Sequence, residues 1–215
     1  MTLSAENVCK TYGKRSVLED CSLSVCAGQC VLLRGPSGGG KSTFLRILAL
    51  LESADSGFVS HDERRWEVSS PQAASPYPFL TVVFQQLFLW PNLTMEQNLS
   101  IVLKHHPNLP LSLQEKETLE RLSIGNLLAR RPHECSLGER QRLAIARSLL
   151  SEARFLLFDE PTSALDRVNR GIFVQELTTA LASNRGVLLV THDDQGFARI
   201  ADQSFELENG RLERS

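Results

Sequence analysis

Residues 35 to 43 combine four glycines, a lysine and three hydroxyl side chains in the order Gly-Pro-Ser-Gly-Gly-Gly-Lys-Ser-Thr. The apolar run Val31-Leu32-Leu33 precedes this segment and a helical pattern follows it, which predicts a strand, a glycine-rich turn and a helix. Glycines let backbone N–H groups turn toward an anion, and the positive end of the new helix adds to the field. The alternative is a glycine-rich loop with a chance Lys-Ser pair, but the order of elements favours a P-loop that binds a nucleoside triphosphate.

Within this loop, Lys41 supplies a charge for the terminal phosphates and Ser42 supplies a hydroxyl ligand for Mg²⁺. The residues expected to bind the nucleotide here are Gly35, Pro36, Ser37, Gly38, Gly39, Gly40, Lys41, Ser42 and Thr43.

Two acidic residues follow a second apolar run. The segment Phe155-Leu-Leu-Phe158 predicts a parallel strand buried on both faces, so Asp159 and Glu160 should emerge at its carboxyl end, where α/β folds bind ligands. Mg²⁺ prefers oxygen ligands, and Asp159 is expected to hold it together with Ser42. Glu160 is then free to orient or deprotonate the attacking water. The alternative is that both acids only begin a loop and balance Lys41.

Three further residues have a functional and a structural interpretation. His192 and Gln85 each follow a predicted strand, so His192 could reach the terminal phosphate and Gln85 could bind a metal-bound water and a moving loop. A lone histidine is more often structural, so the residues alone leave both roles open. Tyr12 lies in a turn around Gly13. Its ring is either an exposed side chain of this turn without a binding role or a surface on which adenine stacks.

The surrounding pattern predicts the elements that position these residues. Alternating side chains at residues 3 to 9 and 16 to 25 indicate antiparallel strands, and the polar, proline-bearing residues 61 to 78 are expected to be exposed and irregular. Ser136 and Glu139 form a capping-box pattern before a long helix. Further helices are predicted at residues 44 to 51, 94 to 103, 112 to 123 and 168 to 182, with a strand at 186 to 190 and a hairpin at 204 to 207 and 211 to 213.

Composition limits the class of protein. A chain of 215 residues suits one α/β domain with a small inserted subdomain and is too short for two nucleotide-binding domains. With 23 basic and 25 acidic residues, no net field attracts nucleic acid, and no nucleic-acid partner is expected. The apolar runs fall far short of the ~20 residues that a membrane helix needs. The first residues lack the features of a cleaved signal, so we expect a cytoplasmic chain. Cysteines 21, 26 and 30 are expected to be small buried hydrophobic residues.

Taken together, the motifs resemble those of an ABC transporter ATP-binding subunit in order and in approximate spacing, over nearly the whole chain. They are the P-loop at 35 to 42, Val83-Phe84-Gln85, residues 136 to 142, residues 155 to 160, Ser163-Ala-Leu-Asp166 and Thr191-His192. The resemblance implies a P-loop NTPase core with a mainly parallel sheet, an N-terminal antiparallel β-subdomain and an α-helical subdomain inserted at about 93 to 150. The whole chain, 1 to 215, would be a single ABC ATP-binding domain.

The resemblance also implies roles for individual residues. Tyr12 would lie on adenine, Gln85 would sense the membrane partner and contribute to the metal site, and His192 would be the switch histidine. Asp159 and Glu160 would form Walker B, with Glu160, His192 and Gln85 as the catalytic group and Ser42, Gln85 and Asp159 around the metal. The residues expected to contact ATP across a subunit interface are Ser136, Gly138, Glu139 and Asp166.

The function that the resemblance implies is Mg²⁺-dependent ATP hydrolysis that powers a membrane transporter through closure of a dimer. Its partners would be integral membrane transporter subunits and a second ATP-binding subunit, identical or different. The protein would be cytoplasmic and peripheral on the inner face of the cell membrane, with no regulatory domain after residue 212. The alternatives are a non-transport ABC ATPase, a catalytically weak regulatory ATP-binding subunit and a P-loop kinase of small molecules.

Residues 135 to 139 depart from the family's signature, Leu-Ser-Gly-Gly-Gln, and the departure at residue 137 matters most. This chain has Cys135-Ser136-Leu137-Gly138-Glu139, so leucine replaces a glycine. If that position has a positive φ, the strain is about 1–2 kcal/mol. We therefore expect Leu137 to weaken the composite site or make it asymmetric.

Overall fold

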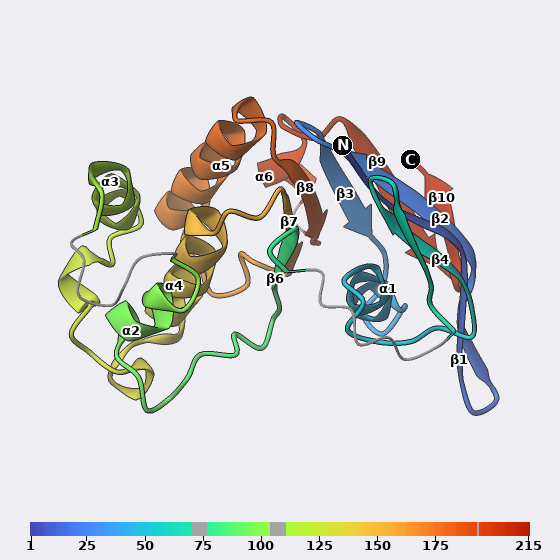
Figure 1. Cartoon of the computed structure of the whole chain (residues 1–215), viewed down its shortest axis with the longest axis horizontal. Helices are drawn as coiled ribbons and strands as arrows, with labels where there is room; N and C mark the ends of the chain where they lie inside the picture. The colour runs from blue at the N-terminus through green and yellow to red at the C-terminus, as the bar shows by residue number, and fades with distance from the viewer. Residues whose placement is uncertain (70–76, 104–110, 193) are drawn as a thin grey trace.

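Two β-sheets, one antiparallel and one mainly parallel, form the framework of the computed structural model, which describes residues 1–69, 77–103, 111–192 and 194–215 (Figure 1). The antiparallel sheet has the order β2-β1-β4-β5, and the second sheet has the order β10-β9-β3-β8-β7-β6. The strands are β1 (Thr2–Tyr12), β2 (Arg15–Cys26), β3 (Cys30–Arg34), β4 (Ser56–His61), β5 (Arg64–Glu67), β6 (Leu80–Val83), β7 (Phe155–Asp159), β8 (Gly186–Val190), β9 (Gln203–Glu208) and β10 (Arg211–Arg214). In the second sheet β10 pairs antiparallel with β9, whereas the pairs formed among β9, β3, β8, β7 and β6 are parallel. The predicted fold class is confirmed.

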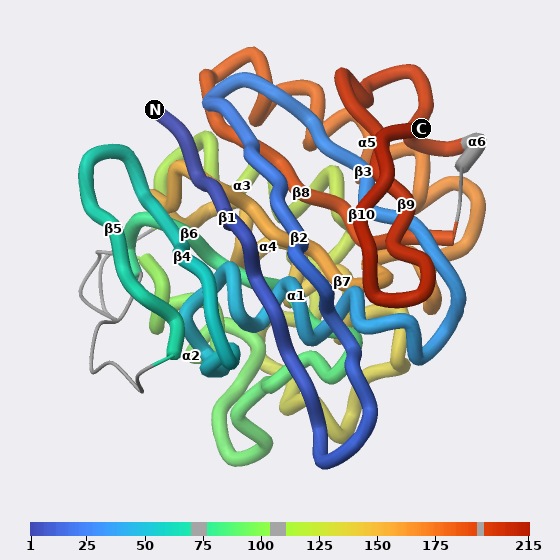
Figure 2. The backbone as a smooth tube through the Cα atoms, turned by 90° about the vertical axis from the view of Figure 1, so that its right-hand side faces the viewer, coloured from blue at the N-terminus to red at the C-terminus, as the bar shows by residue number. Residues whose placement is uncertain are grey.

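The helices lie on both sides of the parallel sheet. They are α1 (Lys41–Leu48), α2 (Met95–Ser100), α3 (Leu113–Arg121), α4 (Leu137–Leu150), α5 (Arg167–Ala182) and α6 (Asp194–Phe197), with short 3-10 turns η1 (Gly125–Leu127) and η2 (Pro132–Glu134). Figure 2 looks onto the antiparallel sheet, with α1 behind it. The helices α2, α3 and α4 all come between β6 and β7 in the chain, as the predicted insertion requires. That these helices act as a separate subdomain stays a prediction.

The central strands are buried on both faces because their side chains alternate between two cores. In β7, Phe155 and Leu157 pack in the core that contains α1 and the antiparallel sheet. Leu156 and Phe158 face the opposite core, which contains residues of α4 and α5. A continuous apolar run is therefore what this strand requires, and its carboxyl end is where the first polar side chains appear.

Capping boxes begin the three inserted helices. The side chains of Thr94, Ser112 and Ser136 each accept a hydrogen bond from the backbone three residues later. The predicted helix starts are confirmed, but α2 ends at Ser100 rather than near 103, and α3 ends at Arg121. Just after α3, Ser123 has a φ of 53°, a left-handed conformation that is common after a helix end.

The carboxyl end of α4 is held by Arg185, which directly precedes β8. The guanidinium donates hydrogen bonds to the carbonyls of Leu149 at 2.6 Å, Ala153 at 2.7 Å and Ser148 at 3.2 Å. Burial lowers the pKa of Arg185 to about 10, but the group remains a cation at neutral pH. A positive charge at this end also complements the helix dipole, so α4 is fixed against the strand that leads to His192.

The expectation that residues 61 to 78 are irregular is wrong for their first part. Residues 56 to 67 form the β4–β5 hairpin, which turns at Asp62 with a φ of 54°. The β5 strand lies at the sheet edge, where charged side chains are favoured and the usual apolar alternation is absent. Arg65 covers the ring of Phe58 at 4.0 Å and pairs with Glu6 at 2.8 Å. Residues 70 to 76 lie outside the described residues.

The five cysteines are all free thiols. Cys21 and Cys30 are buried, and burial raises their pKa values to about 11 and about 12. Cys26 is exposed at the end of β2, so the prediction that it is buried is wrong. Within the described residues, no helix combines the length and apolar character that crossing a bilayer requires.

Candidate active site

The glycine-rich loop between β3 and α1 has a backbone that requires glycine at particular positions. Gly35 has a φ of 136°, and a Cβ atom there would collide with the carbonyl oxygen of Leu207. Gly40 has a φ of 100° and caps α1, and its Cβ would lie 2.8 Å from the side chain of Val17. Any other residue at these two positions would be strained or would clash, so the turn that leads from β3 into α1 requires glycine there.

Lys41 begins α1 and is 6% exposed. Its Nζ donates hydrogen bonds to the carbonyl oxygens of Gly35 at 2.8 Å and Pro36 at 2.9 Å. These carbonyls hold the ammonium at the mouth of the loop, close to a cavity of about 280 Å³. The cavity is lined by Tyr12, Arg15, Val17, Gly38, Gly40, Lys41, Ser42 and Thr43. A buried cation beside a helix N-terminus is an environment suited to phosphate groups.

The three predicted metal ligands line one neighbouring cavity. Ser42, Gln85 and Asp159 share a space of about 390 Å³, and Ser42 also forms part of the wall of the first cavity. They come from α1, from the segment after β6 and from the end of β7. A hydroxyl, an amide oxygen and a carboxylate are the oxygen donors that Mg²⁺ prefers, so the residues present fit this ion.

Glu160 and His192 meet at the same edge of the sheet. Strands β7 and β8 are parallel neighbours, with Asp159 opposite Val190, so the residues that follow them emerge together. The Nε2 atom of His192 lies 3.0 Å from Oε1 of Glu160. Burial raises the pKa of Glu160 above its ordinary value, although the neighbouring His192 and Lys41 oppose this change. A carboxylate in this position is suited to accept a proton from water nearer neutral pH.

The backbone at Glu160 is also unusual. Its φ is 50°, in the left-handed region, and its N–H donates to the carbonyl of Val190 at 2.8 Å. Such a conformation in a residue other than glycine costs on the order of 1–3 kcal/mol and is concentrated at functional sites. The sequence motif did not indicate this strain.

The remaining predicted residues form a second group. Ser136 and Glu139 are engaged in the capping box of α4, where the Ser136 N–H donates to Glu139 Oε2 at 2.7 Å. Asp166 caps α5 by accepting from the N–H of Asn169 at 2.8 Å. A Cβ atom on Gly138 would lie 3.0 Å from the carbonyl of Ala164, so the segments carrying Ser136 and Asp166 lie close together. Neither described cavity beside the P-loop includes Ser136, Gly138, Glu139 or Asp166.

Leu137 is the first residue of α4 and its side chain is 55% exposed. It is not among the residues with positive φ, so the strain considered from the sequence does not occur. What distinguishes this position is an exposed apolar side chain next to Ser136, in the first turn of α4.

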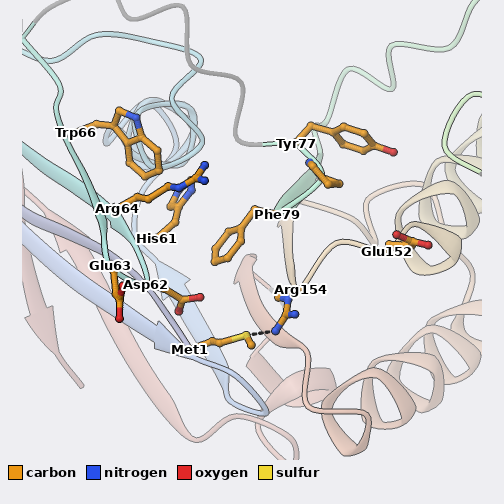
Figure 3. Close-up of a pocket in the computed structure, with 11 residues that line it drawn as sticks. Met1, His61, Asp62, Glu63, Arg64, Trp66, Tyr77, Phe79, Glu152 and Arg154 are labelled. Atoms are coloured by element: carbon orange, nitrogen blue, oxygen red, sulfur yellow. Dashed lines mark hydrogen bonds between the residues drawn. The ribbon is translucent and has the colours of Figure 1, made fainter.

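A cavity of about 850 Å³, larger than the two cavities beside the P-loop, lies at the amino ends of β6 and β7 (Figure 3). Phe79 and Arg154, which line this cavity, directly precede β6 and β7. The cavity is therefore at the opposite end of β7 from Asp159, which is the last residue of that strand. Inside the cavity the rings of His61 and Phe79 stack with centroids 4.9 Å apart. None of the predicted site residues lines this space, so its size does not make it the candidate site.

Several residues near the site had no motif to mark them. Arg15 donates to the carbonyl of Gly38 at 3.1 Å and lines the phosphate cavity. Phe88 and Leu51 are exposed apolar residues that line the cavity of Gln85. The basic first residue of a strand, or an apolar residue in a loop, is too common to be singled out from sequence.

Comparison with known proteins places this geometry in a family. The family model "ABC transporter" matches residues 18–163. The sn-glycerol-3-phosphate import ATP-binding protein UgpC of Chromobacterium violaceum is 36% identical over 224 residues, which cover 99% of this chain and 58% of that protein. The arginine transport ATP-binding protein ArgV of Corynebacterium glutamicum is 34% identical, with 98% of this chain and 88% of that protein covered. The chain thus spans about three fifths of the length of UgpC.

Among solved structures, the dimeric post-hydrolysis state of the ATP-binding cassette MJ0796, bound to ADP and Pi, is similar to the chain with a TM-score of 0.81. The two sequences are 29% identical, and the similarity covers 99% of this chain and 97% of the other.

Proposed function

The chain belongs to the ABC transporter family, and on this premise we propose that it is the ATP-binding and ATP-hydrolysing subunit of a membrane transporter. One observation carries the proposal. The loop with Lys41, the oxygen donors of Ser42, Gln85 and Asp159, and the Glu160–His192 pair all converge at the carboxyl edge of one parallel sheet. This is the edge at which open α/β sheets bind ligands.

Each residue of this group has a task that follows from its place. The P-loop N–H groups and Lys41 bind the phosphates, which requires the ammonium to exchange its two carbonyl partners for phosphate oxygens. Glu160 holds the attacking water and accepts its proton, while His192 orients that carboxylate. Ser42, Asp159 and Gln85 would hold Mg²⁺, which when bound neutralises charge on the phosphates. Tyr12, at the wall of the phosphate cavity, would stack on adenine.

The active unit is proposed to be a dimer, because each chain supplies two half-sites. The P-loop lines a cavity next to α1, whereas α4 and α5 lie on the other side of the parallel sheet (Figure 1). Ser136 and Asp166 cap these two helices, and Gly138 and Glu139 belong to the first turn of α4. In a head-to-tail pair, the helix N-terminus at Ser136 of one copy faces the phosphates held by the other. The dimeric state of the MJ0796 cassette supports this arrangement.

The membrane partner is proposed to bind next to Gln85. Leu51, Phe88 and Trp90 expose apolar side chains, and two of them line the cavity that contains Gln85. Arg147 of α4 donates to the carbonyls of Phe88 at 3.3 Å and Leu87 at 3.2 Å. Movement of a partner on this surface would therefore reach α4 and the signature at its start. The names of UgpC and ArgV favour a small polar solute as cargo.

A phosphate-release assay on the purified chain with ATP and Mg²⁺ tests the enzymatic part of this proposal. We expect turnover that Lys41→Ala abolishes, because the variant loses the buried cation that faces the phosphates. Co-purification of a polytopic membrane protein tests the transport part. Turnover that Lys41→Ala leaves intact would contradict the proposed site, and a soluble complex without any membrane protein would favour a non-transport ATPase.

A further inference from the structure

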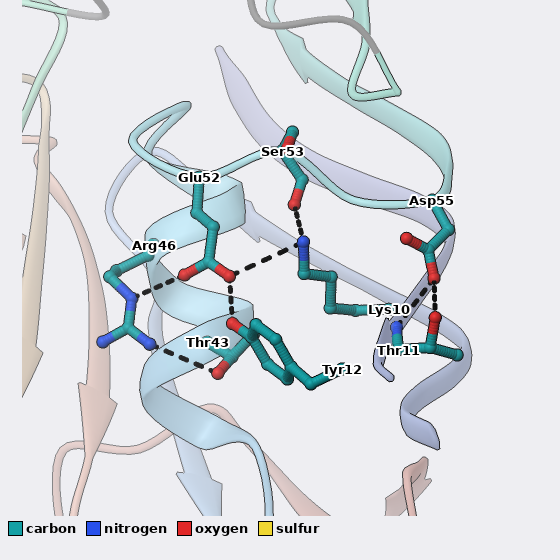
Figure 4. A network of polar contacts seen from close by, with 8 residues as sticks. All are labelled: Lys10, Thr11, Tyr12, Thr43, Arg46, Glu52, Ser53 and Asp55. Atoms are coloured by element: carbon teal, nitrogen blue, oxygen red, sulfur yellow. Dashed lines mark hydrogen bonds and ion pairs between the residues drawn. The ribbon is translucent and has the colours of Figure 1, made fainter. Parts of the chain in front are cut away.

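Tyr12 is connected to the P-loop helix by a chain of polar contacts (Figure 4). Its hydroxyl donates a hydrogen bond to Oε1 of Glu52. The other oxygen of Glu52 accepts from Nε of Arg46 at 2.8 Å. Arg46 in turn donates to the hydroxyl of Thr43 at 3.3 Å. The contacts therefore run from the end of β1 to the residue that follows Ser42 in α1.

A second cation, Lys10, completes this network. The Nζ of Lys10 lies 3.7 Å from Oε1 of Glu52 and 5.1 Å from the centre of the Tyr12 ring, and it donates to the carbonyl of Ser53 at 2.7 Å. Burial acts to raise the pKa of Glu52, but the hydrogen bonds from Tyr12 and Arg46 outweigh it and lower the pKa. Glu52 is therefore ionised at neutral pH, and as an anion it accepts a strong hydrogen bond.

The ring that this network holds has little else to fix it. Tyr12 is 48% exposed and lines the cavity whose wall also includes Gly40 and Thr43. A half-exposed aromatic side chain without such a bond would sample several rotamers. The Glu52 contact selects one of them, in which the ring stays beside the phosphate cavity.

We propose that Glu52 is a positioning residue, which tethers the Tyr12 hydroxyl so that the ring is already placed for a nucleobase when the triphosphate enters. The inference rests on the proposed function and deepens it, because it assigns part of the affinity for the base to a carboxylate that does not line the nucleotide cavity. Pre-placing the ring reduces the entropy that binding must otherwise remove.

A competing explanation is that Glu52 only stabilises the turn after α1. That role would affect every ligand of the P-loop alike, because α1 would be disturbed. A role through Tyr12 affects only ligands with a base. Charge also separates the two explanations, since removing a carboxylate favours anions in general and cannot by itself weaken ATP binding.

The experiment is equilibrium binding of two probes, ATP and inorganic tripolyphosphate, to the full chain. Tyr12→Phe removes the hydroxyl but keeps a ring, and Glu52→Ala removes the acceptor. The double variant completes a cycle. Glu6→Ala is the matched control, because Glu6, like Glu52, forms an ion pair with an arginine at 2.8 Å, in this case Arg65, but it lies in β1 and is not bonded to Tyr12. Thermal unfolding of each variant accompanies the binding data.

We expect Tyr12→Phe and Glu52→Ala each to weaken ATP binding by about threefold to tenfold, the range for loss of one hydrogen bond. The double variant should be no weaker than either single one, tripolyphosphate should bind as tightly as before, and Glu6→Ala should match the parent. If Glu52→Ala fails to fold, Tyr12→Phe alone decides the question.

Two results would overturn the inference and leave the proposed function intact. One is unchanged ATP binding in Tyr12→Phe, and the other is an equal loss for ATP and tripolyphosphate. A parent chain that binds neither probe would overturn the proposed function itself.

Discussion

The Nε2 atom of His192 lies 3.0 Å from Oε1 of Glu160, although the two side chains follow different strands. The backbone sets this contact, because the N–H of Glu160 donates to the carbonyl of Val190 at the end of the neighbouring strand. The two side chains are therefore in direct contact, and the pair can be tested as a unit.

Replacing His192 by alanine should slow ATP hydrolysis by about 10- to 100-fold, because the carboxylate loses the group that orients it. ATP binding should remain, since Lys41 and the loop are unchanged. His133→Ala is a matched control, because His133 is an exposed histidine in η2. Steady-state phosphate release and equilibrium binding of ATP measure both effects. A His192→Ala chain with parental turnover would exclude the pair from the reaction.

The raised pKa of Glu160 predicts the pH dependence of hydrolysis. The carboxyl must be ionised to accept a proton, so the rate should fall on the acid side at a pH above the usual glutamate range near ~4.3. The pH profile of the rate measures this limb. A rate that stays constant down to that ordinary range would contradict the role of Glu160 as base.

The same shift predicts a stability effect. Because the folded state holds the Glu160 proton more tightly than the unfolded chain, ionisation of this carboxyl costs stability at every pH above the raised value. Glu160→Gln removes that cost, and we expect its melting temperature to exceed the parent's by about 1–3 °C at pH 7. The advantage should shrink as the pH falls through the raised pKa of the folded state and should be lost below the unfolded pKa. Thermal unfolding of the parent and the variant at pH 7 and pH 4 provides the comparison. A Glu160→Gln chain that is less stable than the parent at pH 7 would contradict the prediction, because the favourable contacts of the ionised carboxylate would then fully offset the cost of burying it.

Leu137 provides a test of the signature. Because its exposed side chain stands beside Ser136, Leu137→Gly should raise ATP turnover by at least about twofold if the leucine obstructs the facing subunit. The matched control is Leu113→Gly, since Leu113 is 74% exposed and follows the Ser112 capping box of α3 in the same way. Both variants should lose a similar ~0.5–1 kcal/mol of helix stability. Turnover of Leu137→Gly no higher than the parent's would remove this explanation.

The sequence predicted the features that depend on neighbouring residues. The order of strand, glycines, lysine and helix from residue 31 onward is a local requirement, and so is the capping box at Ser136. The helix, however, runs from Lys41 to Leu48 and not to the predicted residue 51. The apolar run at Phe155 predicted a strand buried on both faces, which placed Asp159 at the carboxyl edge of the sheet.

Features that depend on distant partners could not be predicted in this way. The charged β5 strand shows no apolar alternation because it lies at a sheet edge. The left-handed φ of Glu160 is imposed by a bond to Val190, and the Tyr12 tether joins two segments that are far apart in sequence. Only the packed fold brings these partners together.

The central claim is that two chains enclose ATP between the P-loop of one and the signature of the other. The most direct measurement is analytical ultracentrifugation of Glu160→Gln with ATP and Mg²⁺, combined with quantification of bound nucleotide. We predict a dimer that retains one ATP per chain, with hydrolysis slowed at least ~10²-fold and with Lys41→Ala remaining monomeric. A Glu160→Gln chain that stays monomeric at saturating ATP, or that hydrolyses ATP at the parental rate, would contradict the account.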